Sequence, residues 1–217
     1  MLDVTTLIAI LLACFLLGRL SAHVTIRRLR RHLNNTGWLL SHDSVTGLLN
    51  REGLAATYAD ELADRYTVVA LIDLDNFKAV NDTFGHQTGD ELLLAVAERI
   101  KHVAALLGGV AAHLSGDEFV AIVPADTRGD HVAATLTMML NEPVALRTSD
   151  GHIVEASASV GATSASPTQP LNDALRRADV AMYHAKRLGR GELAFFEPGM
   201  MMPPQEGVRR GPRACRR

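Results

Sequence analysis

The stretch Leu114-Ser115-Gly116-Asp117-Glu118-Phe119-Val120 predicts a tight β-hairpin with two carboxylates at its tip. The flanking segments 109–114 and 119–123 are apolar and partly β-branched, as buried strands are. Ser-Gly is a strong turn signal, and the glycine supplies the backbone freedom that a closely approaching phosphate needs. Adjacent carboxylates at a strand edge repel each other unless a cation lies between them. The turn therefore indicates a metal site, although solvated acidic turns are also common.

A second group of carboxylates ends the apolar run of residues 67–74 (TVVALIDL), which is typical of a central strand covered on both faces. Asp73-Leu74-Asp75 lies at the end of this strand, where ligands bind in open sheets with helical crossovers. If the strand pairs beside the hairpin, Asp73 and Asp117 can share hard cations such as Mg²⁺. Two carboxylate groups on neighbouring strand ends predict a two-metal arrangement for phosphoryl or nucleotidyl transfer.

Length and charge narrow the class of protein. The 217 residues, with a formal net charge of −2, leave room for one domain of ordinary size beside an apolar N-terminal tract. No basic field is present, so nucleic acid is not expected as a partner. Cys14 and Cys215 lie at opposite ends of the chain, which does not support a disulfide framework and favours a reducing compartment.

The N-terminal tract predicts a membrane anchor over residues 1–20, with Arg19 snorkelling to the membrane surface. A secretory signal would carry positive charge before the tract, whereas here the basic residues follow it: Arg27, Arg28, Arg30 and Arg31. The positive-inside rule then predicts a single-pass protein of the inner (cytoplasmic) membrane with its body in the cytoplasm. The alternative is that the tract forms a buried core helix.

The remaining chain divides into a basic helical stalk (21–42), a globular body (43–197) and a disordered tail (198–217) rich in Met, Pro, Gly and Arg. Besides the hairpin, the body predicts helices over 51–63, 88–107, 130–140 and 171–188, and strands over 67–74, 143–147, 152–158 and 193–196. These elements lack a regular βα rhythm. We therefore expect an α/β fold of the α+β kind, with a central mixed, mainly antiparallel sheet flanked by helices.

Five ordered segments resemble the motifs of GGDEF domains, the diguanylate cyclases. They are residues 43–51 (DSVTGLLNR), 73–90 (DLDNFKAVND continued by FGHQTGD), 115–119 (SGDEF), 157–162 (SASVGA) and 178–190 (ADVAMYHAKRLGR). The resemblance covers nearly all of residues 43–197, and the order and spacing of the five segments make it specific.

The resemblance implies a polymerase-palm or nucleotidyl-cyclase-like domain that condenses two GTP molecules into cyclic di-GMP and releases two pyrophosphates. It implies a head-to-tail homodimer, in which each subunit holds one GTP. By position, Asp73, the main-chain carbonyl of Leu74 and Asp117 would bind Mg²⁺, two ions per GTP, with Mn²⁺ as an alternative ion. Asp117 and Glu118 would deprotonate or position the 3′-hydroxyl group.

The remaining implied positions contact the nucleotide. Asn81 and Asp90 would bind the guanine edge, with His86 in the same pocket, because this pair of side chains offers the donor and acceptors that guanine matches. The groups implied at the phosphates are Lys78, Lys186 and Arg190, the backbone N–H groups after the strand end at Asn76 and Phe77, and the turn residues Ser115 and Gly116. If the family resemblance is set aside, Lys186 and Arg190 are equally well interpreted as solvated surface residues. Asn81 can then be a cap or turn residue, and His86 an ordinary half-buried histidine.

Three positions depart from the family pattern. Ser115 replaces the first glycine of the naming motif, and His113 stands where arginine is common. Leu106-Leu107-Gly108-Gly109 occupies the place of the Arg-x-x-Asp product-inhibition site, so no feedback through that site is expected. Two functions remain: a membrane-anchored diguanylate cyclase, or a catalytically silent GGDEF module that binds GTP and acts as a regulatory scaffold. Cyclic mononucleotide synthesis on a related palm fold fits poorly.

Overall fold

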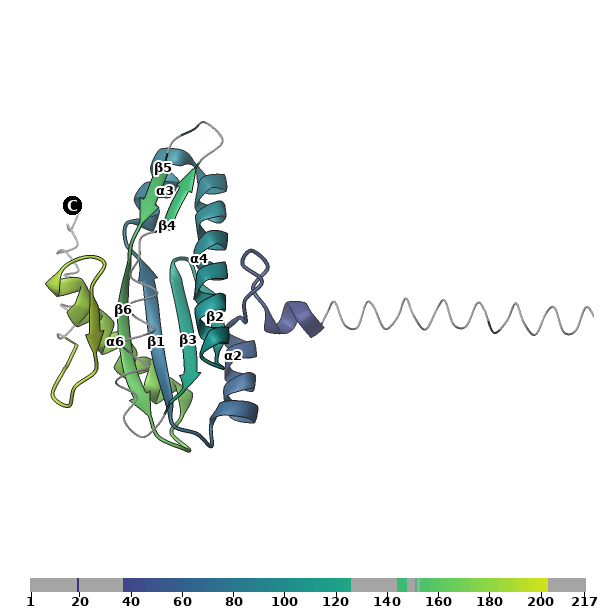
Figure 1. Cartoon of the computed structure of the whole chain (residues 1–217), viewed down its shortest axis with the longest axis vertical. Helices are drawn as coiled ribbons and strands as arrows, with labels where there is room; N and C mark the ends of the chain where they lie inside the picture. Colours follow the sequence, from purple (N-terminus) through teal and green to yellow (C-terminus); the bar gives the residue numbers. More distant parts are fainter. Residues whose placement is uncertain (1–18, 20–36, 126–143, 148–150, 152, 203–217) are drawn as a thin grey trace, which may run out of the picture.

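The central strand is β1 (Thr67–Leu74), whose residues are buried except for Asp73, which is partly exposed. In the computed structural model, which describes residues 19, 37–125, 144–147, 151 and 153–202, β1 is the middle of a five-stranded sheet (Figure 1). The strand order is β2-β3-β1-β6-β7, with bounds β2 (Val110–Ser115), β3 (Glu118–Pro124), β6 (Ala158–Ala165) and β7 (Leu193–Phe195). All neighbouring strands are antiparallel except the parallel pair β6–β7. The predicted mixed, mainly antiparallel sheet is therefore confirmed.

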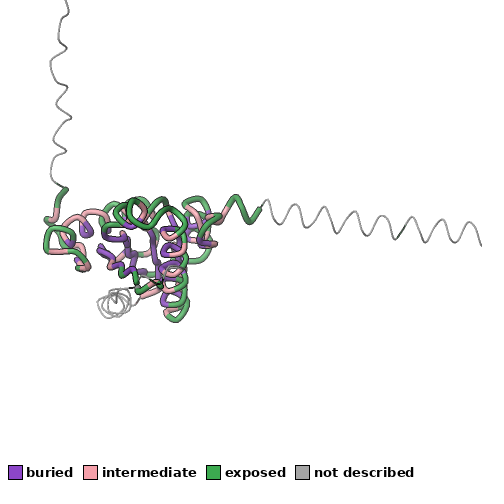
Figure 2. Tube along the Cα trace, turned by 90° about the horizontal axis from the view of Figure 1, so that it is seen from above, coloured by how far each residue is buried: buried purple, intermediate pink, exposed green. Residues whose placement is uncertain are grey.

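Helices cover both faces of this sheet, as the apolar run of β1 requires. Alternate residues of β1, among them Val68 and Ile72, pack in one core with α4 (His86–Leu106). Val69 and Leu71 point to the other face and pack with α2 (Arg51–Thr57) and α6 (Leu171–Leu188). Figure 2 shows the buried residues gathered between the exposed outer turns. The period of two along the strand thus divides the core in two.

The predicted helices that fall within the described residues are present, with two local differences. The structure places α6 over the predicted residues and begins α4 at His86, two residues before the predicted start. The predicted helix 51–63 is instead α2 followed by a π-helical turn, η1 (Tyr58–Leu62). The hydroxyl of Tyr58 donates to the carbonyl of Gln169 at 2.9 Å, which ties η1 to the segment before α6. Single π-turns of this kind leave no clear signal in the sequence pattern.

Two elements were not predicted. The helix α3 (Phe77–Phe84) contains the string Asn-Asp-Thr, which is typical of turns. The strand β6 is built of small residues without the alternation of a half-buried strand, and it becomes a strand by pairing with β1. The predicted strand 152–158 corresponds to β5 (Ile153–Ala156), which pairs with β4 (Val144–Arg147) as an antiparallel hairpin.

Several predictions lie outside the described residues: the anchor 1–20 apart from Arg19, the stalk up to residue 36, the helix 130–140 and the tail from residue 203. Residues 37–41, at the end of the stalk, are helical. No helix within the described part of the chain is long and apolar enough to cross a membrane. Residues 198–202, the first of the predicted tail, are described, and the last three of them line a cavity beside α6.

Candidate functional site

A cavity of about 430 Å³ lies where β1 ends and α3 begins. It gathers side chains from the end of β1, the start of α3, the β2–β3 turn and the end of α6. The lining residues are Asp73, Leu74, Asp75, Asn76, Phe77, Lys78, Asp117, Lys186 and Arg190. The sequence assigned a separate role to eight of these nine residues, and it noted the ninth, Asp75, only as part of the carboxylate group at the end of β1.

Two of the three carboxylates of the cavity, Asp73 and Asp117, come together because β1 pairs with β3, as the sequence predicted. Asp73 lies opposite Glu118 in the antiparallel register. The N–H of Leu74 donates to the main-chain carbonyl of Asp117 at 3.1 Å, which fixes the hairpin turn against the end of β1. Gly116 adopts φ +56°, the left-handed conformation that glycine reaches without strain.

The environment of Asp73 favours a cation. Burial raises the pKa of Asp73 above its ordinary value, opposed by Lys186, while the neighbouring charges of Asp117 and Asp75 raise it further. The Nζ atom of Lys186 lies 2.7 Å from Asp73 Oδ1. Repulsion between carboxylates in a partly buried cavity is relieved by a bound positive charge.

The donors present fit magnesium better than a transition metal. No group of three or more His, Cys, Asp or Glu side chains in the described part of the chain is arranged to hold a metal. Mg²⁺ is commonly held by one or two carboxylates, with substrate phosphates and water completing its octahedron. The carboxylates of Asp73 and Asp117, with the main-chain carbonyl of Leu74, match that requirement.

The same cavity provides groups for an anion. Asn76 adopts φ 59° and begins α3, and its carbonyl accepts from the N–H of Ala79 at 2.8 Å. The first N–H groups of a helix have no partner within the helix and can bind phosphate oxygens. Lys78, Lys186 and Arg190 add positive charge around this helix start. Cation ligands and phosphate ligands therefore lie side by side.

The residues predicted to bind guanine lie on the adjacent helices and do not line the cavity. Asn81 is on α3, whereas His86 and Asp90 are exposed in the first turns of α4. Asn81 Oδ1 is buried and has no hydrogen-bond partner among the described residues. A Cβ at Gly89 would overlap this oxygen, so the glycine keeps the space that the Asn81 side chain occupies. A buried acceptor without a donor is rare and is suited to receive one from a ligand.

Glu118 and Ser115 also lie outside the cavity. Glu118 lines a neighbouring depression on the α6 side, together with Arg51, Arg176 and Asp179. Burial raises the pKa of Asp179, opposed by Lys186. Ser115 is exposed at the end of β2, so its side chain does not crowd the described cavity.

His113, noted in the sequence only as a replacement for arginine, links the N-terminal turn to the hairpin. Its buried ring stacks on Phe119 and places Nε2 3.0 Å from the carbonyl oxygen of Gly116. Its Nδ1 lies 2.9 Å from Asp43 Oδ1, so the imidazole and the carboxylate are in direct contact. Burial would raise the pKa of Asp43, but His113 and the N–H and hydroxyl of Thr46 outweigh it and hold the pKa below its ordinary 3.8.

Replacement of Asp43 is expected to weaken the fold at neutral pH. Because the pKa of Asp43 is lower in the folded chain, its contribution is complete above pH 4 and is lost as the pH falls through the folded value. Asp43→Asn should lower the free energy of unfolding by about 1–2 kcal/mol at pH 7, and by less at pH 3. Urea unfolding at both pH values measures this, with the exposed Asp60→Asn as a control. Equal losses for Asp43→Asn at pH 7 and pH 3 would contradict the assignment.

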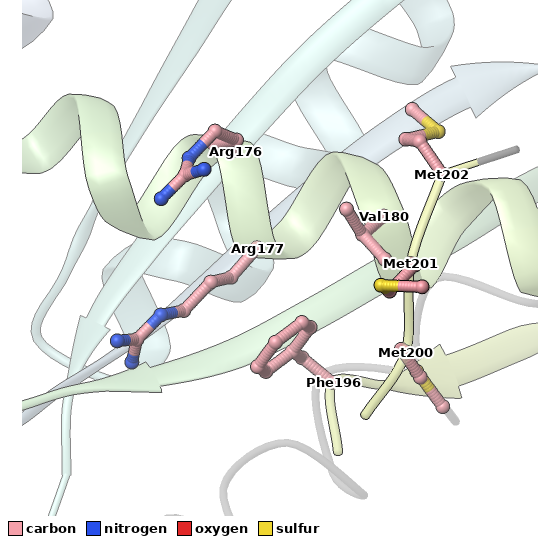
Figure 3. Close-up of a pocket in the computed structure, with 7 residues that line it drawn as sticks. All are labelled: Arg176, Arg177, Val180, Phe196, Met200, Met201 and Met202. Atoms are coloured by element: carbon pink, nitrogen blue, oxygen red, sulfur yellow. The ribbon is translucent and has the colours of Figure 1, made fainter. Parts of the chain in front are cut away.

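A second cavity, of about 370 Å³, lies between α6 and the C-terminal segment (Figure 3). Arg176 and Arg177 come from α6, and Phe196 and three methionines come from the segment that follows β7. The Arg177 guanidinium carbon lies 5.7 Å from the centre of the Phe196 ring. None of the residues that line this cavity carries a carboxylate.

Comparisons with known proteins agree with this geometry. The family model described as "Diguanylate cyclase, GGDEF domain" matches residues 40–192. The bifunctional diguanylate cyclase/cyclic di-GMP phosphodiesterase MucR of Pseudomonas aeruginosa is 38% identical over 176 residues, which are 77% of this chain and 25% of MucR. The cyclic di-GMP phosphodiesterase NbdA of the same organism is 33% identical over 192 residues, 83% of this chain and 22% of NbdA. This chain thus spans about a quarter of the length of these relatives.

Solved structures show the same fold. The coiled coil and GGDEF domain of DgcB from Caulobacter crescentus, crystallised in complex with c-di-GMP, aligns with a TM-score of 0.69 and 31% identity. The alignment covers 83% of this chain and 98% of that structure. Diguanylate cyclase SiaD from Pseudomonas aeruginosa, in complex with its activator SiaC, aligns with a TM-score of 0.61 and 26% identity over 88% of this chain and 77% of SiaD.

Proposed function

Because this chain belongs to the GGDEF domain family of diguanylate cyclases, we propose that it condenses two GTP molecules into cyclic di-GMP and releases two pyrophosphates. The observation that carries this proposal is the cavity that joins Asp73 and Asp117 to Lys78, Lys186 and Arg190 at the start of α3. Nucleotidyl transfer needs these two kinds of group together: oxygen ligands for a divalent cation, and cations for the triphosphate.

The reaction forms two phosphodiester bonds. Each 3′-hydroxyl attacks the α-phosphate of the other GTP, the bond to pyrophosphate breaks, and the hydroxyl proton leaves to a base. Asp117 and Glu118 are the groups at the hairpin that accept or direct this proton. One GTP per subunit means that two copies of the chain must meet head to tail, so we propose that a homodimer is the active form.

The other proposed roles are binding of Mg²⁺, of the triphosphate and of guanine. Asp73, Asp117 and the main-chain carbonyl of Leu74 would hold Mg²⁺, which supplies stabilisation of negative charge on the phosphates when it is bound. Lys78, Lys186 and Arg190 would neutralise the triphosphate, and the α3 start at Asn76 and Phe77 would donate backbone N–H groups to it. Asn81 and Asp90 would bind guanine, with His86 beside them.

A second candidate function is a silent module that binds GTP and regulates another protein. Two observations favour it: Ser115 replaces the usual glycine, and NbdA, a relative named only for cyclic di-GMP hydrolysis, contains a similar segment. The exposed position of Ser115, away from the cavity lining, favours the enzyme. Incubating the full chain with GTP and Mg²⁺ and separating the products by chromatography tests both. Binding of GTP without cyclic di-GMP, even when the chains are cross-linked as dimers, would favour the module.

The effect of Ser115 is testable by itself. Ser115→Gly restores the usual residue, and we expect kcat/KM to change by less than about tenfold, because the exposed side chain does not fill the cavity. Initial rates of cyclic di-GMP formation measure this. A gain in kcat/KM of a hundredfold or more would mean that Ser115 suppresses turnover. It would then favour the catalytically silent scaffold as the function of the natural chain.

Feedback inhibition through the site before the hairpin is not expected. Leu106 is exposed at the end of α4, and neither it nor Gly109 offers a charge to the product. A Cβ at Gly109 would overlap the carbonyl oxygen of Ile122, so the local backbone leaves no room for the family aspartate. Titrating cyclic di-GMP against the initial rate should show no non-competitive inhibition. Strong non-competitive inhibition would contradict this prediction.

We further propose that residues 1–20 anchor the chain in the inner membrane as a single-pass protein, with the catalytic domain in the cytoplasm. The apolar tract followed by arginines supports this proposal. Cell fractionation of the full chain and of a chain that begins at residue 37 tests it. The shorter chain should leave the membrane fraction.

A further inference from the structure

Asp75 is the lining residue for which the sequence suggested no role, and its contacts differ from those of Asp73. Its carboxylate is nearly buried, at 8% exposure of the residue. Oδ1 accepts from the hydroxyl of Ser159 at 2.7 Å. Oδ2 accepts from the hydroxyl of Ser157 at 2.8 Å and from the backbone N–H of Gly191 at 2.8 Å. Both oxygens are therefore used by the protein itself.

These hydrogen bonds join three separate segments. Asp75 follows β1, Ser157 directly precedes β6 and Ser159 is its second residue, and Gly191 lies in the loop between α6 and β7. The backbone adds a further link, because the N–H of Asp75 donates to the carbonyl of Ser157 at 2.9 Å. Asp75 thus connects the end of the central strand to the loop that leaves α6.

The loop held by Asp75 carries a cationic residue of the cavity. Arg190 directly precedes Gly191, so the Gly191–Asp75 hydrogen bond fixes the peptide next to Arg190. Gly191 has φ +73°, and a Cβ there would come within 3.4 Å of the Ser157 side chain. The loop therefore lies close against Ser157, in a conformation that favours glycine.

We propose that Asp75 is a positioning residue, which holds the 189–191 loop so that Arg190 faces the phosphates of the nucleotide. This inference rests on the proposed function, because it assigns Arg190 to GTP. An ionised carboxylate is suited to the task, since it accepts several hydrogen bonds at once and each is strengthened by the charge. Arg190 itself is exposed, and without this link its long side chain and loop would have to be ordered by the ligand.

Asparagine and alanine at position 75 separate this role from direct binding of a metal. In Asp75→Asn, the amide oxygen can accept from Ser157 and Gly191 while its NH₂ donates to Ser159, so the loop stays attached. Asp75→Ala removes all three side-chain contacts. A metal ligand would suffer from both changes, because each removes the charge, whereas a positioning residue tolerates asparagine.

The experiment measures binding of a fluorescent GTP analogue, with Mg²⁺, by full-length variants. We expect Asp75→Ala and Arg190→Ala each to weaken binding about tenfold, and Asp75→Asn to weaken it less than threefold. The double variant, Asp75→Ala with Arg190→Ala, should bind no worse than Arg190→Ala alone. Asp82→Ala, an exposed carboxylate on α3, is the matched control and should bind as the wild type does. The proposal would be overturned if the fold-losses of affinity of Asp75→Ala and Arg190→Ala multiplied in the double variant. It would also be overturned if Asp75→Asn and Asp75→Ala lost the same affinity.

Amide hydrogen exchange of the Gly191 N–H gives a readout that needs no ligand. We expect this amide to be protected in the wild type and in Asp75→Asn, and to exchange at least tenfold faster in Asp75→Ala. If Asp75→Ala does not fold, the double change Ser157→Ala with Ser159→Ala removes the two hydroxyls and should raise the exchange rate in the same direction. Unchanged Gly191 exchange overturns the positioning role, whereas wild-type protein that binds no GTP analogue overturns the proposed function instead.

Discussion

Asp117→Asn should reduce cyclic di-GMP formation on the order of 10³-fold or more while the chain remains folded. Asp117 lines the cavity at the hairpin tip and is one of the two carboxylates that we propose hold Mg²⁺. Asparagine removes the charge but keeps the size of the side chain. The contact that fixes the turn uses the main-chain carbonyl of Asp117, to which the Leu74 N–H donates, so the substitution leaves that contact in place.

The measurement compares initial rates of the full-length wild type and Asp117→Asn at saturating GTP and Mg²⁺, with thermal unfolding as the test of the fold. Asp82→Asn on α3 is the control for loss of a carboxylate outside the cavity, and it should retain wild-type rates. Retention of more than a tenth of the wild-type rate by Asp117→Asn would show that this carboxylate does not carry the reaction.

Gly161→Ala should destabilise the fold more than most single-methyl additions. Gly161 lies in β6 where the strand packs against α6, and a Cβ there would overlap the Ala178 carbonyl oxygen and the backbone of Met182. Backbone atoms cannot rotate away as a side chain can, so α6 must shift outward. We expect a loss at the upper end of the range for overpacking, about 3 kcal/mol, and a decrease in Tm of roughly 6–12 °C.

This change also reports on the site, because α6 carries Lys186 and leads to Arg190. An outward shift of α6 should therefore weaken GTP binding together with stability. Differential scanning calorimetry of the full chain measures the loss of stability. Gly37→Ala is the matched control, because a Cβ at Gly37 meets no atom within 4 Å, and its Tm should change little. A Tm for Gly161→Ala within about 2 °C of the wild type would mean that the β6–α6 contact relaxes at low cost.

Much of the site followed from local sequence. The apolar run of β1 ends in carboxylates, and the Ser-Gly turn carries two more, so a cation site at the sheet end was predictable from strand periodicity and turn chemistry. The helix α6 was predictable because its apolar positions recur at helical spacing. The roles proposed for Asn81 and His86 came from the resemblance alone, since each of these residues has an ordinary structural explanation by itself.

Other features depend on contacts between segments far apart in the chain. The strand β6 has little strand character of its own and exists because β1 offers it a partner. The helix α3 overrides a turn-like string once Asn76 adopts its left-handed conformation. The cavity that receives Phe196 and the methionines likewise needs the segment after β7 to lie against α6.

The hairpin Ser115–Glu118, the central strand and the general chemistry of the cavity were determined by the sequence itself, because turn propensity and a period of two are properties of neighbouring residues. Only the tertiary structure decided what each carboxylate does. Asp73 is on β1 and Asp75 directly follows this strand, and local sequence does not tell the two carboxylates apart. The fold places Lys186 at 2.7 Å from the first, and two serines with the Gly191 N–H around the second. The two carboxylates therefore differ in partners that lie more than 80 residues away in the chain, which local sequence does not specify.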